Sequence, residues 1–213
     1  MKRFLLITVA VIVVFTLSSA AWYLSKLDFH KRPAHIIPTI SNSVFAKVKV
    51  HAPAILSYAQ KNGYNTGICF MVNMSMESGT NRFFVFDLQN DSILNAGLVT
   101  HGSCNKDWLT GRQYGNMPGC NCTSLGKYKI GKPYQGKFGL AYKLYGLDST
   151  NSNAFKRFVV LHSLTCVPDS EVHPYPICQS YGCPAVSPAF LKKLAVTIDS
   201  SSRPILLWIF EDF

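Results

Sequence analysis

Val-Val-Leu-His-Ser at 159–163 and Ser-Tyr-Gly-Cys-Pro-Ala-Val at 180–186 are the two segments around which this 213-residue chain is organised. The β-branched apolar run predicts a buried strand that carries His162 at its end. A loop then presents Gly182 and Cys183. Cysteine attacks as its thiolate, and histidine is the side chain suited to taking and returning a proton near neutral pH. The pattern therefore predicts Cys183 as a nucleophile and His162 as its base.

Gly182 has a predicted role of its own. Because glycine has no Cβ, it lets the backbone approach a substrate closely. The amide N–H groups of Gly182 and Cys183 are then expected to face the oxyanion that develops during acyl transfer. The competing interpretation is a structural histidine and an inert buried cysteine, since both are common in protein cores.

Beyond this pair, the order His-Ser followed by Ser-x-Gly-Cys resembles the signature of the bacterial L,D-transpeptidase catalytic domain (YkuD-like). The sub-family whose motif continues as Gly-Cys-Pro-Ala is the most similar, although it tends to carry Gly-Arg where this chain has Cys178-Gln179. The resemblance covers roughly Asn65 to Phe210, and several collinear motifs are more specific than one. The other matching elements are Arg82–Leu88, Val99–Gly102, Pro118-Gly119, Ser124–Tyr128, Tyr134–Gly139, Gly146-Leu147 and Asn153-Ala154.

The resemblance implies a mainly β fold, a sandwich or barrel with an N-terminal helix. It also implies a short helix after the loop that carries Gly182 and Cys183, which we call the nucleophile loop. It also implies an exported enzyme that joins peptidoglycan stem peptides through a thioester on Cys183, without a metal or an organic cofactor. Ser163 is expected to orient the imidazole of His162 through its backbone carbonyl, with Asp169 and Glu171 as weaker alternatives. The residues expected to shape the loop or contact substrate are Ser180, Tyr181, His101, Tyr134 and Gly136.

Two other functions remain open. With water as the acceptor, the same thioester makes the protein an L,D-carboxypeptidase or amidase. In a non-catalytic module that binds the cell envelope, Cys183 is instead oxidised to a partner such as Cys178. A zinc site formed by His162, Cys166, Cys178 and Cys183 is disfavoured, because the spacing lacks a Cys-x-x-Cys pair.

The chain contains seven cysteines. An odd number leaves at least one unpaired in a monomer. If Cys183 is the nucleophile, the other six can form up to three disulfides in an oxidising compartment. A bridge between Cys166 and Cys178 would staple the loop that precedes Cys183. Pairing in the 104–122 loop stays open, except that the neighbours Cys120 and Cys122 are not expected to bond each other.

The N-terminal sequence has the order of residues typical of an export signal. A basic start, Met1-Lys2-Arg3, precedes the apolar run Phe4–Leu17 and the small residues Ser18–Ala21. This order predicts a secretory signal peptide, or an uncleaved membrane anchor because Trp22–Leu24 extends the apolar span. We therefore expect a signal or anchor at 1–24, a linker and helix at 25–64, and a catalytic domain at 65–213, located in the periplasm or cell envelope.

The net charge of the chain is +10, which limits the kinds of partner it is expected to bind. A hydrophobic content of 48% with 15% charged residues indicates a folded protein. Basic excess is typical of proteins that bind nucleic acid, anionic membranes or acidic polymers. No nucleic-acid motif accompanies it here, so the anionic envelope is the expected counter-charge. A basic surface without any partner is the alternative.

Local signals predict the remaining elements. Apolar spacing predicts a helix over Val44–Lys61, with a kink or a break into two helices at Pro53 and an end at Gly63. Ser187 with Pro188 predicts a helix start, and that helix is expected to run to about Asp199. The expected strands are Ile68–Met74, Phe83–Leu88, Ser92–His101, Tyr128–Ile130, Leu140–Tyr145, Phe158–Leu161 and Pro204–Phe210, joined by turns such as Gly131–Pro133.

Overall fold

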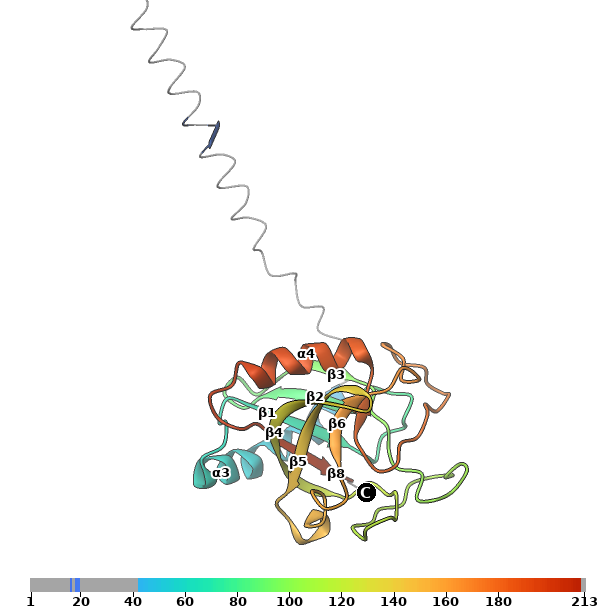
Figure 1. The fold of residues 1–213 in the computed structure, drawn as a ribbon. Helices are drawn as coiled ribbons and strands as arrows, with labels where there is room; N and C mark the ends of the chain where they lie inside the picture. Colours follow the sequence, from blue (N-terminus) through green and yellow to red (C-terminus); the bar gives the residue numbers. More distant parts are fainter. Residues whose placement is uncertain (1–15, 17, 20–41, 212–213) are drawn as a thin grey trace, which may run out of the picture. The chain divides into compact units, whose positions relative to one another are not determined.

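The computed structural model describes Thr16, Ser18, Ser19 and residues 42–211, and the fold below belongs to the unit 37–213 (Figure 1). Apart from those three residues, the predicted signal or anchor lies outside the described residues, as does most of the linker. None of the helices in the described ranges is long and apolar enough to cross a membrane.

One mixed sheet of eight strands forms the centre of this unit, so the mainly β fold class is confirmed. The strand order is β3-β2-β1-β8-β4-β5-β6-β7, and all neighbours are antiparallel except β1–β8 and β6–β7. The strands are β1 (Ile68–Asn73), β2 (Phe83–Asp87), β3 (Ser92–Gly97), β4 (Gly126–Gly136), β5 (Gly139–Gly146), β6 (Val160–Ser163), β7 (Ala185–Val186) and β8 (Leu206–Phe210).

Two of these strands differ from the prediction by more than two residues at an end, and β7 was not predicted. The expected strand Ser92–His101 ends at Gly97, because the chain then turns to the nucleophile loop, where the Thr100 amide donates to Ala185 O. The expected turn at Gly131–Pro133 is wrong. It is a shift of register inside β4, which continues to Gly136. Such a bulge accommodates a proline that cannot donate to the ladder.

Helices cover both faces of the sheet. The predicted N-terminal helix is two helices, α2 (Asn42–Lys49) and α3 (Ala52–Asn62), and Pro53 lies in the first turn of α3, where a missing N–H is harmless. Gly63 ends α3 in the left-handed conformation, with φ of 73°. α4 (Pro188–Asp199) starts where Ser187 Oγ accepts from Phe190 N, as predicted. A short 3-10 helix, η1, spans Ser149–Asn151.

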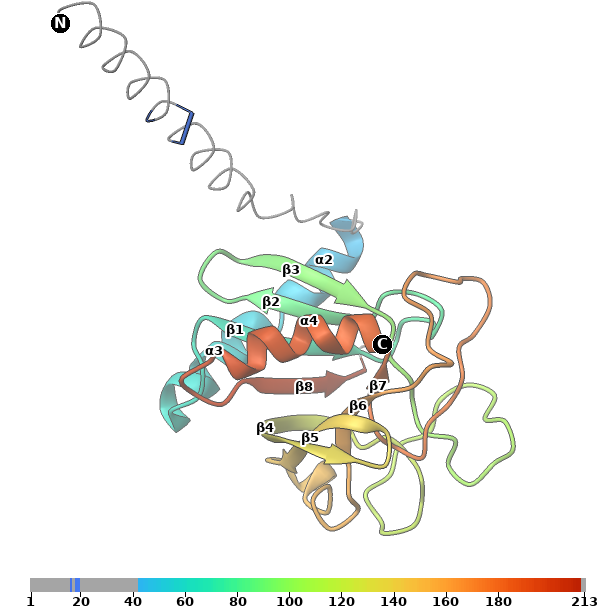
Figure 2. The same cartoon turned by 45° about the horizontal axis from the view of Figure 1, so that its top comes forward.

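Alternation along the strands builds two cores. In β1, Cys69 and Met71 point to the side covered by α3, whereas Phe70 and Val72 point to the side covered by α4. Figure 1 shows the two helices on opposite sides of the sheet, and Figure 2 shows α4 lying across it. The nucleophile loop leads directly into β7 and then α4, and these two elements fix its C-terminal end.

Candidate active site

His162 lies on β6, where its neighbour Leu161 is fully buried in the core. Its Nδ1 is 3.0 Å from the carbonyl oxygen of Ser163. Since a carbonyl only accepts, Nδ1 carries the proton and Nε2 is left as the basic atom. Ser163 thus meets the imidazole through its backbone. Glu171, the weaker alternative, instead accepts from the Asn81 amide.

The surroundings of His162 keep its imidazole neutral. Burial lowers the pKa of His162, and the hydrogen bond to Ser163 offsets part of that shift. The ring of Phe138, from the β4–β5 turn, stacks on the imidazole with centroids 4.8 Å apart and an interplanar angle of 19°. A neutral imidazole with an unprotonated Nε2 is the form that can act as a general base.

Cys183 rests against the start of the same strand. Its Sγ lies 3.5 Å from the Val160 amide nitrogen and 3.7 Å from the Phe158 carbonyl oxygen. Burial raises the pKa of the Cys183 thiol, while the Val160 N–H and the charge of Arg157 partly oppose this. The resting sulfur is therefore a protonated thiol, and its proton has to pass to a base before attack.

The nucleophile loop requires glycine at position 182. Gly182 has φ of 102°, and a Cβ there would lie 2.6 Å from the carbonyl oxygen of Cys122. Ser180 Oγ donates to Cys183 O at 2.6 Å and accepts from Gly182 N at 3.2 Å. Of the two amides predicted to hold an oxyanion, that of Gly182 is engaged within the loop. The Cys183 N–H has no hydrogen-bond partner among the described residues.

A profile of the L,D-transpeptidase catalytic domain matches residues 39–208. The chain belongs to this family. No curated protein shows a significant match to the chain. Within this family, the thiol of Cys183 and the imidazole of His162 are the candidates for the reacting pair.

The solved structures that match the chain show only a distant likeness to it. An avibactam carbamoyl enzyme, Ldtfm, has a TM-score of 0.43 and 10% identity, covering 69% of this chain and 50% of its own. The helical cell shape determining protein Pgp2 from Campylobacter jejuni has 0.42 and 12%, covering 78% and 57%. An L,D-transpeptidase from Xylanimonas cellulosilytica has 0.39 and 14%, covering 72% and 68%. The chain thus spans about half to two thirds of the length of these proteins.

Thr100 holds the backbone of the nucleophile loop of this L,D-transpeptidase domain through its side-chain hydroxyl. Its Oγ1 donates to Cys183 O at 3.2 Å and accepts from Ala185 N at 3.1 Å. The next residue, His101, accepts through its carbonyl oxygen from Ser180 N at 2.9 Å. Thr100 was not among the predicted site residues, although it precedes His101 in the matching element Val99–Gly102.

Arg157 is a second group that the sequence analysis missed. It donates to Cys122 O at 2.6 Å and to Gly115 O at 2.9 Å, and so ties the long 102–125 loop to the nucleophile loop at Gly182. Its charge also favours the thiolate of Cys183. The sequence feature that could have pointed to Arg157 is its position three residues after the matching element Asn153-Ala154.

The side chain of His101 is buried, and 6% of the residue's surface is exposed. Its Nδ1 lies 3.1 Å from Nη2 of Arg82, which is fully buried and can only donate. Its Nε2 lies 3.2 Å from the side-chain nitrogen of Gln179, which also donates to Leu109 O at 2.8 Å. Burial, followed by the charges of Arg82 and Arg112, lowers the pKa of His101 to about 4. The imidazole is therefore neutral near pH 7.

The other predicted contact residues divide into two places. Tyr181 is 78% exposed, two residues before Cys183, and Ser180 is buried inside the loop. Tyr134 pairs with Ala141 across the sheet, and Ala141 pairs with His162, so one strand, β5, lies between Tyr134 and the strand that carries the imidazole. The ring of Tyr134 lies over Gly136, where a Cβ would be 3.1 Å from its Cε2.

Two disulfides form, Cys104–Cys122 and Cys166–Cys178. The predicted bridge between Cys166 and Cys178 is present, and it uses two of the four ligands of the alternative zinc site. The described residues include no cluster of His, Cys, Asp or Glu that could hold a metal ion. Cys183 is free, so the Cys178–Cys183 bridge of the binding-module hypothesis is absent. The remaining free cysteines are Cys69, which is buried, and Cys120.

Proposed function

We propose that this chain is an exported L,D-transpeptidase that joins peptidoglycan stem peptides through a thioester on Cys183. The observation that carries the proposal is the protonation of the His162 imidazole together with the position of the Cys183 thiol. His162 presents an unprotonated Nε2 because Ser163 holds the proton on Nδ1, and the Cys183 thiol lies against the same strand. Membership of the L,D-transpeptidase family supports the choice of substrate.

In the first step, His162 Nε2 takes the thiol proton and Sγ attacks the carbonyl carbon that precedes the terminal D-amino acid of a donor stem peptide. The amide of Cys183 donates to the oxyanion, and that of Gly182 joins it when Ser180 releases it. The C–N bond then breaks, His162 returns its proton to the leaving amine, and a thioester remains.

In the second step, the amine of an acceptor stem peptide attacks the thioester carbonyl carbon. His162 takes a proton from this amine, and the C–S bond breaks as the new amide forms. The sulfur leaves as a thiolate, and His162 protonates it to restore the resting thiol. One amide bond is thus exchanged for another, so no oxidant, metal or nucleotide is consumed.

Export and attachment at the envelope are part of the same proposal. The two disulfides support an oxidising compartment, because such bonds are rare in a reducing cytosol. The N-terminal sequence supports a cleaved signal or an anchor. The Gly-Cys-Pro-Ala continuation after Ser180-Tyr181 supports the sub-family named above.

The test is incubation of the purified protein with disaccharide stem peptides, followed by mass analysis of the products. Cross-linked dimers are expected, and they should be lost in Cys183→Ala but retained in Cys120→Ala, which removes a second free thiol. Shortened monomers without dimers would instead identify an L,D-carboxypeptidase, with water as the acceptor. Unchanged substrate would refute both activities.

A further inference from the structure

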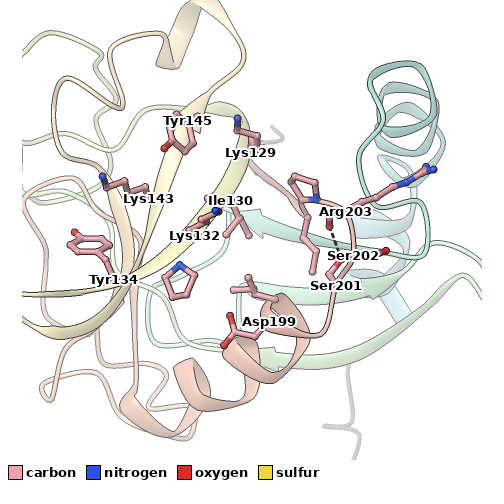
Figure 3. A pocket seen from close by; sticks show the side chains of 15 residues that line it. Lys129, Ile130, Lys132, Tyr134, Lys143, Tyr145, Asp199, Ser201, Ser202 and Arg203 are labelled. Carbon is pink, nitrogen blue, oxygen red and sulfur yellow. Dashed lines mark hydrogen bonds between the residues drawn. The ribbon is translucent and has the colours of Figure 1, made fainter.

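A basic groove of about 830 Å³ lies apart from the nucleophile, along β4 and β5 and the segment that follows α4 (Figure 3). Neither Cys183 nor His162 lines it. Four cationic side chains do, with one carboxylate: Lys129, Lys132, Lys143, Arg203 and Asp199. We call this set the basic groove.

The positive charge of the basic groove exceeds the negative charge that lines it. Within 42–211, none of its four cations forms an ion pair with a carboxylate. Its single acid, Asp199, accepts a hydrogen bond from the Tyr142 hydroxyl at 3.0 Å. An uncompensated cluster of cations in a hollow surface attracts anions more strongly than the same charges on a convex surface.

Aromatic rings hold two of the lysines in place. Nζ of Lys129 lies 4.5 Å from the ring centroid of Tyr145, and Nζ of Lys143 lies 5.7 Å from those of Tyr134 and Phe155. A cation–π contact orients an ammonium group and leaves its charge available to a ligand. The groove therefore presents fixed positive charges, as a site for an anion requires.

The charged ends do not converge on one point. In Figure 3, those of Lys129, Lys143 and Arg203 lie at separate places around the groove. A single phosphate would need them to meet, whereas a chain with repeated charges can contact them in turn. Amine and guanidinium groups both bind phosphate oxygens well.

The aromatic rings argue against nucleic acid. Proteins that bind single strands stack bases on open ring faces. Here Phe155 stacks on Tyr145 at 5.1 Å and Lys129 also lies over that ring, while Lys143 lies over Tyr134. We propose that the basic groove binds a linear phosphodiester polyanion without bases, of the poly(glycerol phosphate) class, beside the transpeptidase site and independently of its chemistry.

The test is a fluorescence-anisotropy titration of the full-length chain with labelled poly(glycerol phosphate). The double variant Lys129→Gln with Lys143→Gln should weaken binding by about 25-fold, at about fivefold per lysine, and should reduce the salt dependence. The matched control is Lys192→Gln with Lys193→Gln, which removes the same charge from exposed positions of α4 and should change little. If the double variant misfolds, Arg203→Gln, on an exposed loop, is an independent variant that should also weaken binding of the polymer.

Several results would overturn the assignment. Equal weakening by the α4 control would mean non-specific attraction, and no binding by the wild type would remove the site altogether. Tighter binding of an oligonucleotide or of polyglutamate with matched charge would assign another ligand. Competition by inorganic phosphate at equal charge concentration would indicate a site for a single anion. Cross-linking of soluble stem peptides should be unchanged in the groove variants, so this test is separate from that of the proposed function.

Discussion

The thiol of Cys183 donates toward the carbonyl oxygen of Phe158, 3.7 Å away. The backbone of Phe158 is in the left-handed region, with φ of 56°, and this conformation sets the direction of its carbonyl group. The residue is 83% exposed. An aromatic residue in this conformation is uncommon, and its ring gains little from burial here. The resting direction of the sulfur thus depends on the backbone of Phe158.

Replacement of Phe158 separates the backbone from the ring. Asn tolerates the left-handed region and a β-branched residue does not, so Phe158→Asn should keep most activity, while Phe158→Ile should lose about tenfold in kcat. Both variants lack the ring and are therefore matched. The measurement is steady-state cross-linking of stem peptides. Equal losses in the two variants would assign the effect to the ring.

Phe138 is expected to set the pH range of the base. Its ring helps to bury the imidazole, and burial lowers the pKa of His162. Removing the ring in Phe138→Ala lets water reach the imidazole, so the pKa should rise toward its ordinary value and the base form should be lost at a higher pH. The acid limb of the kcat/KM profile should therefore move upward, whereas Phe138→Tyr should leave it in place. An unmoved limb in Phe138→Ala would show that other groups bury the imidazole.

His101 is expected to make stability depend on pH. Its pKa is about 4 in the folded protein against 6.5 when free, so the unfolded chain binds the extra proton first as the pH falls. The stability it contributes is complete above about pH 6.5 and is lost progressively toward pH 4, by at most about 3 kcal/mol. Urea unfolding at pH 7 and pH 5 should show a smaller drop for His101→Asn, which keeps an acceptor for Arg82. An identical drop would place the titration elsewhere.

Gly182→Ala should disable the loop without unfolding the domain. The added Cβ would lie 2.6 Å from Cys122 O, so the loop has to move, and a displacement of about 1 Å at a reacting group costs about a hundredfold in rate. Gly119→Ala is the matched control, because Gly119 also has a positive φ, 76°, but nothing lies within 4 Å of its missing Cβ. Comparable activity losses in both variants would mean that backbone strain, and not contact, is the cause.

Local rules predicted much of the fold. The start of α4 at Ser187 and the end of α3 at Gly63 follow from caps that depend on neighbouring residues only. The strand that bears His162 follows from a short apolar run. The β4 bulge did not follow, because Gly131–Pro133 has the composition of a turn and only pairing with β5 makes it part of a strand.

The site was predictable where motifs are contiguous. His162, Ser163, Gly182 and Cys183 stand in two short segments that carry their own signal. Arg157 was missed because its contacts with Cys122 and Gly115 join positions more than thirty residues apart. The partner of Cys104 lies only 18 residues away, and it was left open because Cys120 and Cys122 stand close together in the same loop. Such pairings depend on how the long loops pack, and no local pattern specifies them.

The central claim is that the sulfur of Cys183 becomes acylated. Its most direct test is the mass of the intact protein, stopped by acid shortly after mixing with a donor stem peptide and no acceptor. The account predicts a mass gain equal to the donor without its terminal D-amino acid, located on Cys183 by digestion, slowed in His162→Gln and absent in Cys183→Ala. Product formation with an adduct on Cys120, or a wild-type adduct rate unchanged in His162→Gln, would contradict it.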